Sequence, residues 1–406
     1  MKKNIKILIG IIIAVLIIII GVIIYFIFKP EARPWYPDYN LNSNINSGVL
    51  PNVNEATNQP TANTNASSGL PGVDNIAKGG YTETSLVESD TRDVVLTDSN
   101  GFAYYDQDTG GLYRLVPGSD PELLTDDVYL GAEKVTFSGD ASKAIIEFPD
   151  GSNIMYDTRR DKQYTLPAEM EDFSFNETGS QIAYKYMGIS EFDRWYATSN
   201  PDGTGINAID LLGDNGDKVS IDWSPAGQIV GHWWEAREDL QLEIKFLGEH
   251  DENFASTLVR GIGFVGQWTP DGQKLLYSVS NVETGLKPKL WIVDANPGNI
   301  GRNMVDLSLQ TWADKCTMTS DSSTIYCAVP INLDNGAGLA REVANDNADE
   351  IYKIDLNNGI KTRIAIPVNE SGLSDKTIKQ LFVDEEENLL YYIENMTDNL
   401  ESIKLK

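Results

Sequence analysis

One phrase of apolar and polar positions recurs along the chain, and GQWTPDGQKLLYS at Gly266–Ser278 shows it most clearly. An apolar or aromatic anchor residue is followed by small polar residues, Pro, Asp, Gly or Ser, and then by an apolar run. Seven copies are visible, with anchors at Leu96, Phe137, Phe175, Trp223, Trp268, Met318 and Phe382. The segment that ends at each anchor predicts a short strand, the small polar residues a tight turn, and the apolar run the partner strand of a hairpin.

A third apolar segment follows each hairpin after a further loop. These segments lie near Leu112, Ile154, Ile206, Leu242, Leu290, Ile351 and Ile403. They alternate in polarity and are too short for helices, so they predict strands. Successive anchors are 38 to 64 residues apart, which suits one four-stranded sheet per repeat.

An isolated four-stranded sheet would leave both of its apolar faces in water, whereas sheets stacked around an axis bury each other. We therefore predict that residues 81–406 form an all-β, seven-bladed β-propeller, with six or eight blades as the alternative. The seventh repeat ends after its third strand. We expect Thr82–Asp90, which precedes the first repeat, to supply the missing outermost strand and close the ring.

An uncharged run of 22 residues, Ile7–Phe28, predicts a single transmembrane helix at the amino terminus. The run is longer than the core of a cleaved signal peptide and has no small-x-small site at its end, so we expect an uncleaved signal anchor. Lys2, Lys3 and Lys6 precede it and predict a cytoplasmic amino terminus. Residues 1–29 are thus the cytoplasmic tail and membrane anchor of a single-pass protein, and the propeller lies outside the cytoplasm, in the periplasm or at the cell surface.

Residues 30–80 are expected to be a flexible linker. Ten asparagines lie between Asn40 and Gly80, among many Ser, Thr, Gly and Pro residues, and no apolar period is visible.

The charge of the chain limits its partners. Three of its 32 basic residues precede the predicted span, so the rest carries 29 basic against 60 acidic residues, a net charge of −31. Such a field repels phosphate backbones, and we expect no nucleic-acid partner.

Four of the repeat phrases resemble a known family. WSPAG at Trp223, WTPDG at Trp268, FSGDA at Phe137 and FNETG at Phe175 are each followed by an apolar run and a later strand, and they resemble the TolB-type, WD-repeat-like propeller repeat. The resemblance covers Thr84–Lys406. It implies a β-propeller whose commonest role is protein binding in the cell envelope.

Cys316 and Cys327 are the only cysteines, and they flank the hairpin from Met318 to Ile325 in one register. Cross-strand partners lie near enough for a bridge, and a disulfide persists outside the cytoplasm. We predict this disulfide, with two buried thiols as the alternative.

Motifs for catalysis are missing from the sequence. His232 and His250 are the only histidines, and no G-x-S-x-G, HExxH or P-loop pattern is present. We therefore predict no catalytic residue, no metal site and no cofactor. A pair of carboxylates in the central funnel stays open as an alternative.

Two connections between second and third strands are longer than the others, Gly188–Gly205 and Ile331–Glu350. Connections of this type lie on one face of a propeller, and long loops on a rigid scaffold often carry binding residues. The candidate binding residues on the first loop have side-chain types that are enriched at interfaces: Phe192, Arg194, Trp195 and Tyr196. On the second loop the candidates are Arg341 and Glu342. Trp233 and Trp234 are adjacent on one strand, so they should face opposite ways, and we assign them to the core.

These expectations describe a membrane-anchored binding or scaffolding module of the cell envelope, with a protein or an envelope polymer on the long-loop face. The rival is an envelope enzyme, a hydrolase or lyase of glycans or peptides that uses carboxylates in the funnel. A purely structural spacer is a third possibility.

Overall fold

The computed structural model describes residues 72–97, 101–250 and 252–406. The predicted span Ile7–Phe28 and the linker up to residue 71 lie outside these residues. The described residues are almost entirely strands and loops, with five 3-10 helices of three or four residues. None of their helices has the length and apolar character needed to cross a membrane.

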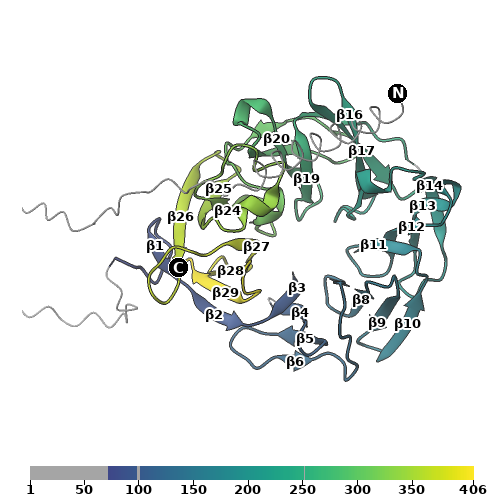
Figure 1. The fold of residues 1–406 in the computed structure, drawn as a ribbon, viewed down its shortest axis with the longest axis horizontal. Helices are drawn as coiled ribbons and strands as arrows, with labels where there is room; N and C mark the ends of the chain where they lie inside the picture. Colours follow the sequence, from purple (N-terminus) through teal and green to yellow (C-terminus); the bar gives the residue numbers. More distant parts are fainter. Residues whose placement is uncertain (1–71, 98–100, 251) are drawn as a thin grey trace, which may run out of the picture. The chain divides into compact units, whose positions relative to one another are not determined.

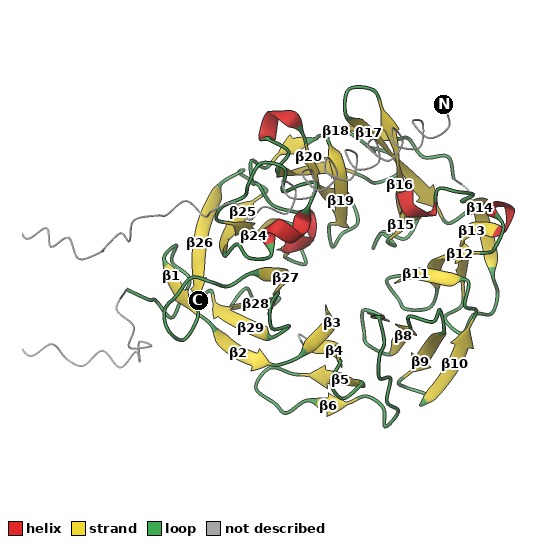
Figure 2. Ribbon diagram, viewed as in Figure 1, coloured by secondary structure: helices red, strands yellow, loops and turns green. Residues whose placement is uncertain are grey.

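Strands β3 to β29 form seven sheets in chain order, which we call blades one to seven (Figures 1 and 2). Blades one to three contain β3 (Thr91–Leu96), β4 (Phe102–Asp106), β5 (Gly111–Leu115) and β6 (Glu122–Leu123); β7 (Lys134–Phe137), β8 (Lys143–Glu147), β9 (Asn153–Asp157) and β10 (Lys162–Leu166); and β11 (Met170–Phe175), β12 (Ile182–Met187), β13 (Arg194–Ser199) and β14 (Asn207–Leu211). Blades four and five contain β15 (Val219–Ile221), β16 (Ile229–Arg237), β17 (Gln241–Gly248) and β18 (Thr257–Arg260); and β19 (Ile262–Trp268), β20 (Lys274–Ser280), β21 (Pro288–Asp294) and β22 (Val305–Asp306). Blades six and seven contain β23 (Cys316–Met318), β24 (Thr324–Pro330), β25 (Asp349–Asp355) and β26 (Lys361–Val368); and β27 (Ile378–Val383), β28 (Leu389–Glu394) and β29 (Leu400–Lys404). The 3-10 helices are η1 (Glu191–Asp193), η2 (Gly216–Lys218), η3 (Val282–Thr284), η4 (Ala313–Lys315) and η5 (Arg341–Ala344).

The amino-terminal part of the described chain closes the ring. Strand β2 (Ser85–Glu88) pairs antiparallel with β29 and is the outermost strand of blade seven, which confirms the predicted closure. Strand β1 (Tyr81–Glu83) was not foreseen as a separate strand: it pairs in parallel with β26 as a fifth strand on blade six. Contacts with the ring begin even earlier, since the Ala77 N–H donates to the Lys404 carbonyl at 2.8 Å.

Apolar contacts between neighbouring blades form the core. Seven clusters of buried residues each combine side chains from two adjacent blades. At the closing seam, Phe102 of blade one lies edge-on to Phe382 and Tyr391 of blade seven, with ring centroids 5.5 and 4.9 Å apart. The blades thus bury one another's faces, and the seven-bladed propeller is confirmed.

The repeated phrase is explained by its turn. In WTPDG the Thr269 hydroxyl donates to the Asp271 carboxylate at 2.6 Å and accepts the Lys274 N–H at 3.0 Å. Gly272 lies at φ 64°, a conformation that glycine adopts without strain. The pairs Ser138–Asp140 and Thr319–Asp321 make the same turn in blades two and six. Hydroxyl and carboxylate therefore set the hairpin geometry in several blades.

Aspartate side chains also join neighbouring blades. Each accepts a backbone N–H from the innermost strand of the next blade: Asp93 from Val135 at 2.9 Å, Asp172 from Ile221 at 3.1 Å, and Asp349 from Ile378 at 2.6 Å. These bonds fix the rotation of one blade against the next, because the acceptor and the donor belong to different sheets.

Candidate functional site

The two faces of the ring differ in their exposed apolar side chains. Connections between second and third strands, and those from one blade to the next, leave at one face, which we call the crossover face; the other connections form the opposite face. Among the described residues, loops of the crossover face expose eleven large apolar side chains: Val128, Leu130, Ile189, Phe192, Leu240, Val282, Ile331, Leu339, Val343, Leu373 and Met396. Loops of the opposite face expose four: Val116, Ile206, Met304 and Ile360.

The prediction of a long loop over Gly188–Gly205 is wrong. Arg194–Ser199 forms β13, the third strand of blade three, and the segment near Ile206 contains β14, which is the outermost strand. The connection on the crossover face therefore spans only residues 188–193. Strand β14 is largely exposed, so its Ile and Leu residues did not mark a core strand as they do in the other repeats.

The structure separates the candidate residues of blade three. Phe192 projects from the crossover face with 70% of its surface exposed. The guanidinium of Arg194 is paired with Asp214 at 3.0 Å. Trp195 is partly buried within β13, and Tyr196, which is 5% exposed, packs between blades three and four. Only Phe192 of this group is presented to a partner on the crossover face.

The long connection of blade six is present as predicted, over residues 331–348. Its N–H groups at Gly336 and Gly338 donate to the carbonyls of Gly285 and Leu286 in blade five, each at 2.8 Å. A small apolar cluster lies beneath it: Trp312, Leu333, Ala337 and Ala344. The loop is thus held to the ring by its own core while Leu339 and Val343 stay exposed.

Arg341 and Glu342 line a cavity of about 350 Å³ on the crossover face, beside connections of blades five to seven. The Arg341 guanidinium lies 5.1 Å from the ring centre of Trp312 and pairs with Asp314 at 2.6 Å. Lys379 of blade seven also lines this cavity. The two predicted loops lie on blades three and six, which are not neighbours, so they do not form one site.

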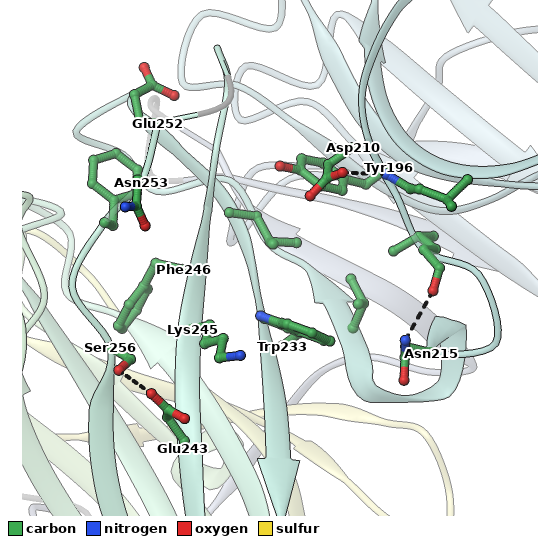
Figure 3. Close-up of a pocket in the computed structure, with 15 residues that line it drawn as sticks. Tyr196, Asp210, Asn215, Trp233, Glu243, Lys245, Phe246, Glu252, Asn253 and Ser256 are labelled. Carbon is green, nitrogen blue, oxygen red and sulfur yellow. Dashed lines mark hydrogen bonds between the residues drawn. The ribbon is translucent and has the colours of Figure 1, made fainter.

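A larger groove, about 550 Å³, lies between blades three and four. Strands β13 and β14 with the connection to β15 form one wall. Strands β15 to β17 with the connection to β18 form the other. Figure 3 shows Asp210 and Tyr196 above Trp233, with Asn253 and Phe246 to the left. Aromatic rings thus face carboxylate and amide groups.

Two of the charged groups in this groove are already paired. The Lys245 ammonium lies 4.6 Å from the ring centre of Trp233 and donates to Glu235 at 2.8 Å. Glu243 accepts hydrogen bonds from Arg237 and from the Ser256 hydroxyl, and these bonds lower the pKa of Glu243. The groove therefore contains one cation on its aromatic floor and one neutralised carboxylate.

Carboxylates also gather near the innermost strands of blades two to four. Lys185 on β12 pairs with Asp172 on β11 at 3.0 Å. Burial raises the pKa of Asp222 to about 7, with a smaller contribution from the charge of Asp172. Burial also raises the pKa of Glu147. His232 is buried, its Nδ1 has no hydrogen-bond partner among the described residues, and burial lowers its pKa to about 4.

Cys316 and Cys327 are paired across β23 and β24, with their Cα atoms 4.0 Å apart, and a disulfide joins them. Both lie in the apolar cluster between blades five and six. Among the described residues, no group of three or more His, Cys, Asp or Glu side chains is arranged to hold a metal ion.

Sequence reasoning missed the groove. Trp233 and Trp234 face opposite neighbours, as predicted, and both contact buried clusters, but Trp233 also lines the groove. Asp210 and Asn253 carried no signal in the sequence, because they meet Trp233 only through the packing of two blades.

No protein-family model matches the chain, and no curated protein sequence matches it. Solved structures resemble it. A chain of the mitotic checkpoint complex is 13% identical, with a TM-score of 0.50 over 88% of this chain and 99% of that one. The β-propeller domain of Cps50 (Swd1) from Myceliophteria thermophila is 11% identical, with a TM-score of 0.50 over 80% of this chain and all of the other. An oligogalacturonate lyase in complex with manganese is 12% identical, with a TM-score of 0.45 over 82% of this chain and 99% of that one. At these identities the likeness shows the fold alone.

Proposed function

We propose that this protein is a membrane-anchored propeller outside the cytoplasm that binds or scaffolds proteins of the cell envelope through its crossover face. The observation that carries the proposal is the excess of exposed apolar side chains on that face, eleven against four among the described residues. Exposed apolar side chains concentrated on one face of a folded domain are typical of an interaction site. The anchor and the location rest on the sequence of residues 1–28 and on the resemblance to TolB-type repeats.

The character of these side chains favours a protein over an envelope polymer. Phe192, Val343 and Leu373 are apolar and more than a third exposed. They gain free energy when they are buried against apolar groups, which a protein surface supplies and a hydroxyl-rich polymer does not.

Affinity purification from the native host tests the proposal. The tagged full-length protein is compared with a variant that carries Leu339→Ser, Val343→Ser and Leu373→Ser. A matched control carries Val116→Ser, Ile206→Ser and Ile360→Ser on the opposite face. The proposal expects the same partner with the wild type and the control, and at least about tenfold less with the crossover variant, since each lost apolar contact costs about 1 kcal/mol or more. Equal recovery with all three proteins would dismiss it.

A second candidate is an envelope enzyme that uses the central carboxylates. The observation in its favour is the group formed by Asp172, Asp222 and Glu147, in which two carboxyl groups have raised pKa values, as general acids often do. Incubation of the wild type and an Asp222→Asn variant with envelope glycans and peptides tests it. Cleavage by the wild type that the variant lacks would support this candidate.

A further inference from the structure

We propose that the groove between blades three and four binds an arginine side chain of an extended protein segment. The groove lies on the flank of the ring, and strands of blades three and four supply most of its lining. Leu212 and Asn215, on the connection between these blades, also line it, but none of the eleven exposed apolar side chains of the crossover face does. Its occupant is therefore a second contact with a protein partner. The inference rests on the proposed function only in that the partner is a protein.

The floor of the groove suits a flat cation. Trp233 is half-buried, and the chain's own Lys245 ammonium lies over its ring. Phe246 and Tyr196 are buried beside it. An aromatic face attracts a cation, and a guanidinium also stacks on it as a flat group. Lys245, which is held by Glu235, shows that a positive charge is favourable over the Trp233 ring. It lines the cavity of about 550 Å³ but does not fill it.

The rim of the groove carries carboxylates that lack a strong cationic partner. Asp210 accepts only the N–H of its neighbour Leu211, at 2.7 Å, among the bonds in the described residues. Glu252 accepts the His250 N–H at 2.7 Å, and among the described residues the basic side chain paired with it is the exposed imidazole of His250, at 3.6 Å. These carboxylates leave the mouth of the groove negative.

Arginine fits this arrangement better than other groups. Its guanidinium has donors along two edges, which match a carboxylate in bidentate fashion while the face stacks on an aromatic ring. A lysine ammonium supplies the charge without the flat shape. A sugar supplies hydroxyl groups but no positive charge for the carboxylates of Asp210 and Glu252. The side-chain amide of Asn253, which makes no hydrogen bond with the described residues, is placed to bind the backbone that flanks the arginine.

Fluorine NMR of the full-length protein in neutral detergent tests this inference. The protein carries 5-fluorotryptophan, and Trp233→Phe identifies the resonance of Trp233. Titration with Nα-acetyl-argininamide is expected to shift that resonance in a saturable way. The uncharged analogue Nα-acetyl-citrullinamide should bind at least about tenfold more weakly, and Nα-acetyl-lysinamide should also bind more weakly than the arginine compound.

Asp210→Asn and Glu252→Gln should each weaken the arginine compound about three- to tenfold. Glu177→Gln, which removes an exposed carboxylate from a turn of the same blade three, should leave the affinity unchanged. Thermal unfolding verifies that each variant folds. An equal response to the arginine and citrulline compounds, an equal response to lysine, or a stronger response to chitotriose would overturn the inference. None of these results bears on the crossover face, so the two proposals fail separately.

Discussion

The carboxylate of Asp349, in blade six, accepts the backbone N–H of Ile378, in blade seven, at 2.6 Å. The same carboxylate binds the Lys315 ammonium through both oxygens, at 2.7 and 2.8 Å. Asp349 is fully buried and Lys315 is nearly so. A single side chain thus satisfies a buried charge and joins two blades.

Asp349→Ala should therefore destabilise the propeller severely. The substitution leaves the Lys315 charge buried without a partner and the Ile378 N–H without an acceptor, at a cost of about 3–5 kcal/mol. Arg341→Ala breaks the more exposed pair with Asp314 and should cost about 1 kcal/mol or less. Chemical denaturation of both variants measures the difference. Similar losses in the two variants would contradict this account.

Two groups, His232 and Asp222, should change the free energy of unfolding with pH in opposite directions. Burial lowers the pKa of His232 from 6.5 to about 4, so between these values only the unfolded chain is protonated there and stability rises with pH. Burial raises the pKa of Asp222 from 3.8 to about 7, so over that range the folded chain holds the extra proton and stability falls with pH.

Asp222→Asn removes the falling contribution. Relative to the wild type, the free energy of unfolding of this variant should increase with pH between pH 4 and 6.5, by at most about 1.4 kcal/mol per pH unit. Because Asp222 is partly exposed, we expect less than this limit. Urea unfolding at pH 4.5, 5.5 and 6.5 measures the slope. If the free energies of unfolding of the variant and the wild type change in parallel with pH, Asp222 does not titrate as described.

The disulfide should contribute measurably to stability. Cys316 and Cys327 are 11 residues apart, so closing this loop in the unfolded chain corresponds to about 3 kcal/mol in the chain-entropy account. The free energy of unfolding of the variant with Cys316→Ser and Cys327→Ser should be lower by that amount, and its denaturation midpoint should lie at a lower denaturant concentration. Mass spectrometry after alkylation without reductant provides the control, since two free thiols in the purified protein would remove the prediction.

The amino-terminal strands should be required for a stable ring. A fragment of residues 89–406 lacks β1 and β2 and leaves blade seven with three strands. Its Tm should lie at least about 5 °C below that of residues 72–406. Residues 84–406, which keep β2 but lose β1 and the bond from Ala77, should be intermediate. Equal melting temperatures for all three fragments would show that closure needs neither strand.

Much of the fold could be predicted from the sequence, because strands buried on both faces leave a strong apolar signal. Six of the seven third strands were placed correctly. Blade three failed because β13, Arg194–Ser199, mixes aromatic and polar residues, while the exposed β14 alternates in the way expected of a core strand. A pattern of polarity alone therefore does not distinguish a buried third strand from an exposed outermost strand.

The candidate sites were harder to predict, since they depend on which side chains meet across blades. Phe192 and Arg341 do lie on the crossover face, but Tyr196 belongs to a buried cluster. The groove joins Asp210 to Trp233 only through the packing of blades three and four. No local spacing in the sequence records such a meeting.

Site-specific photo-crosslinking in the native host tests the role of the crossover face most directly. A benzophenone amino acid replaces Val343, Leu373 or Met396 on that face, and Val116 or Ile360 on the opposite face. Our account predicts crosslinks to one and the same protein from the three crossover positions and none from the other two. Crosslinks to that protein from the opposite face, with none from the crossover face, would contradict it.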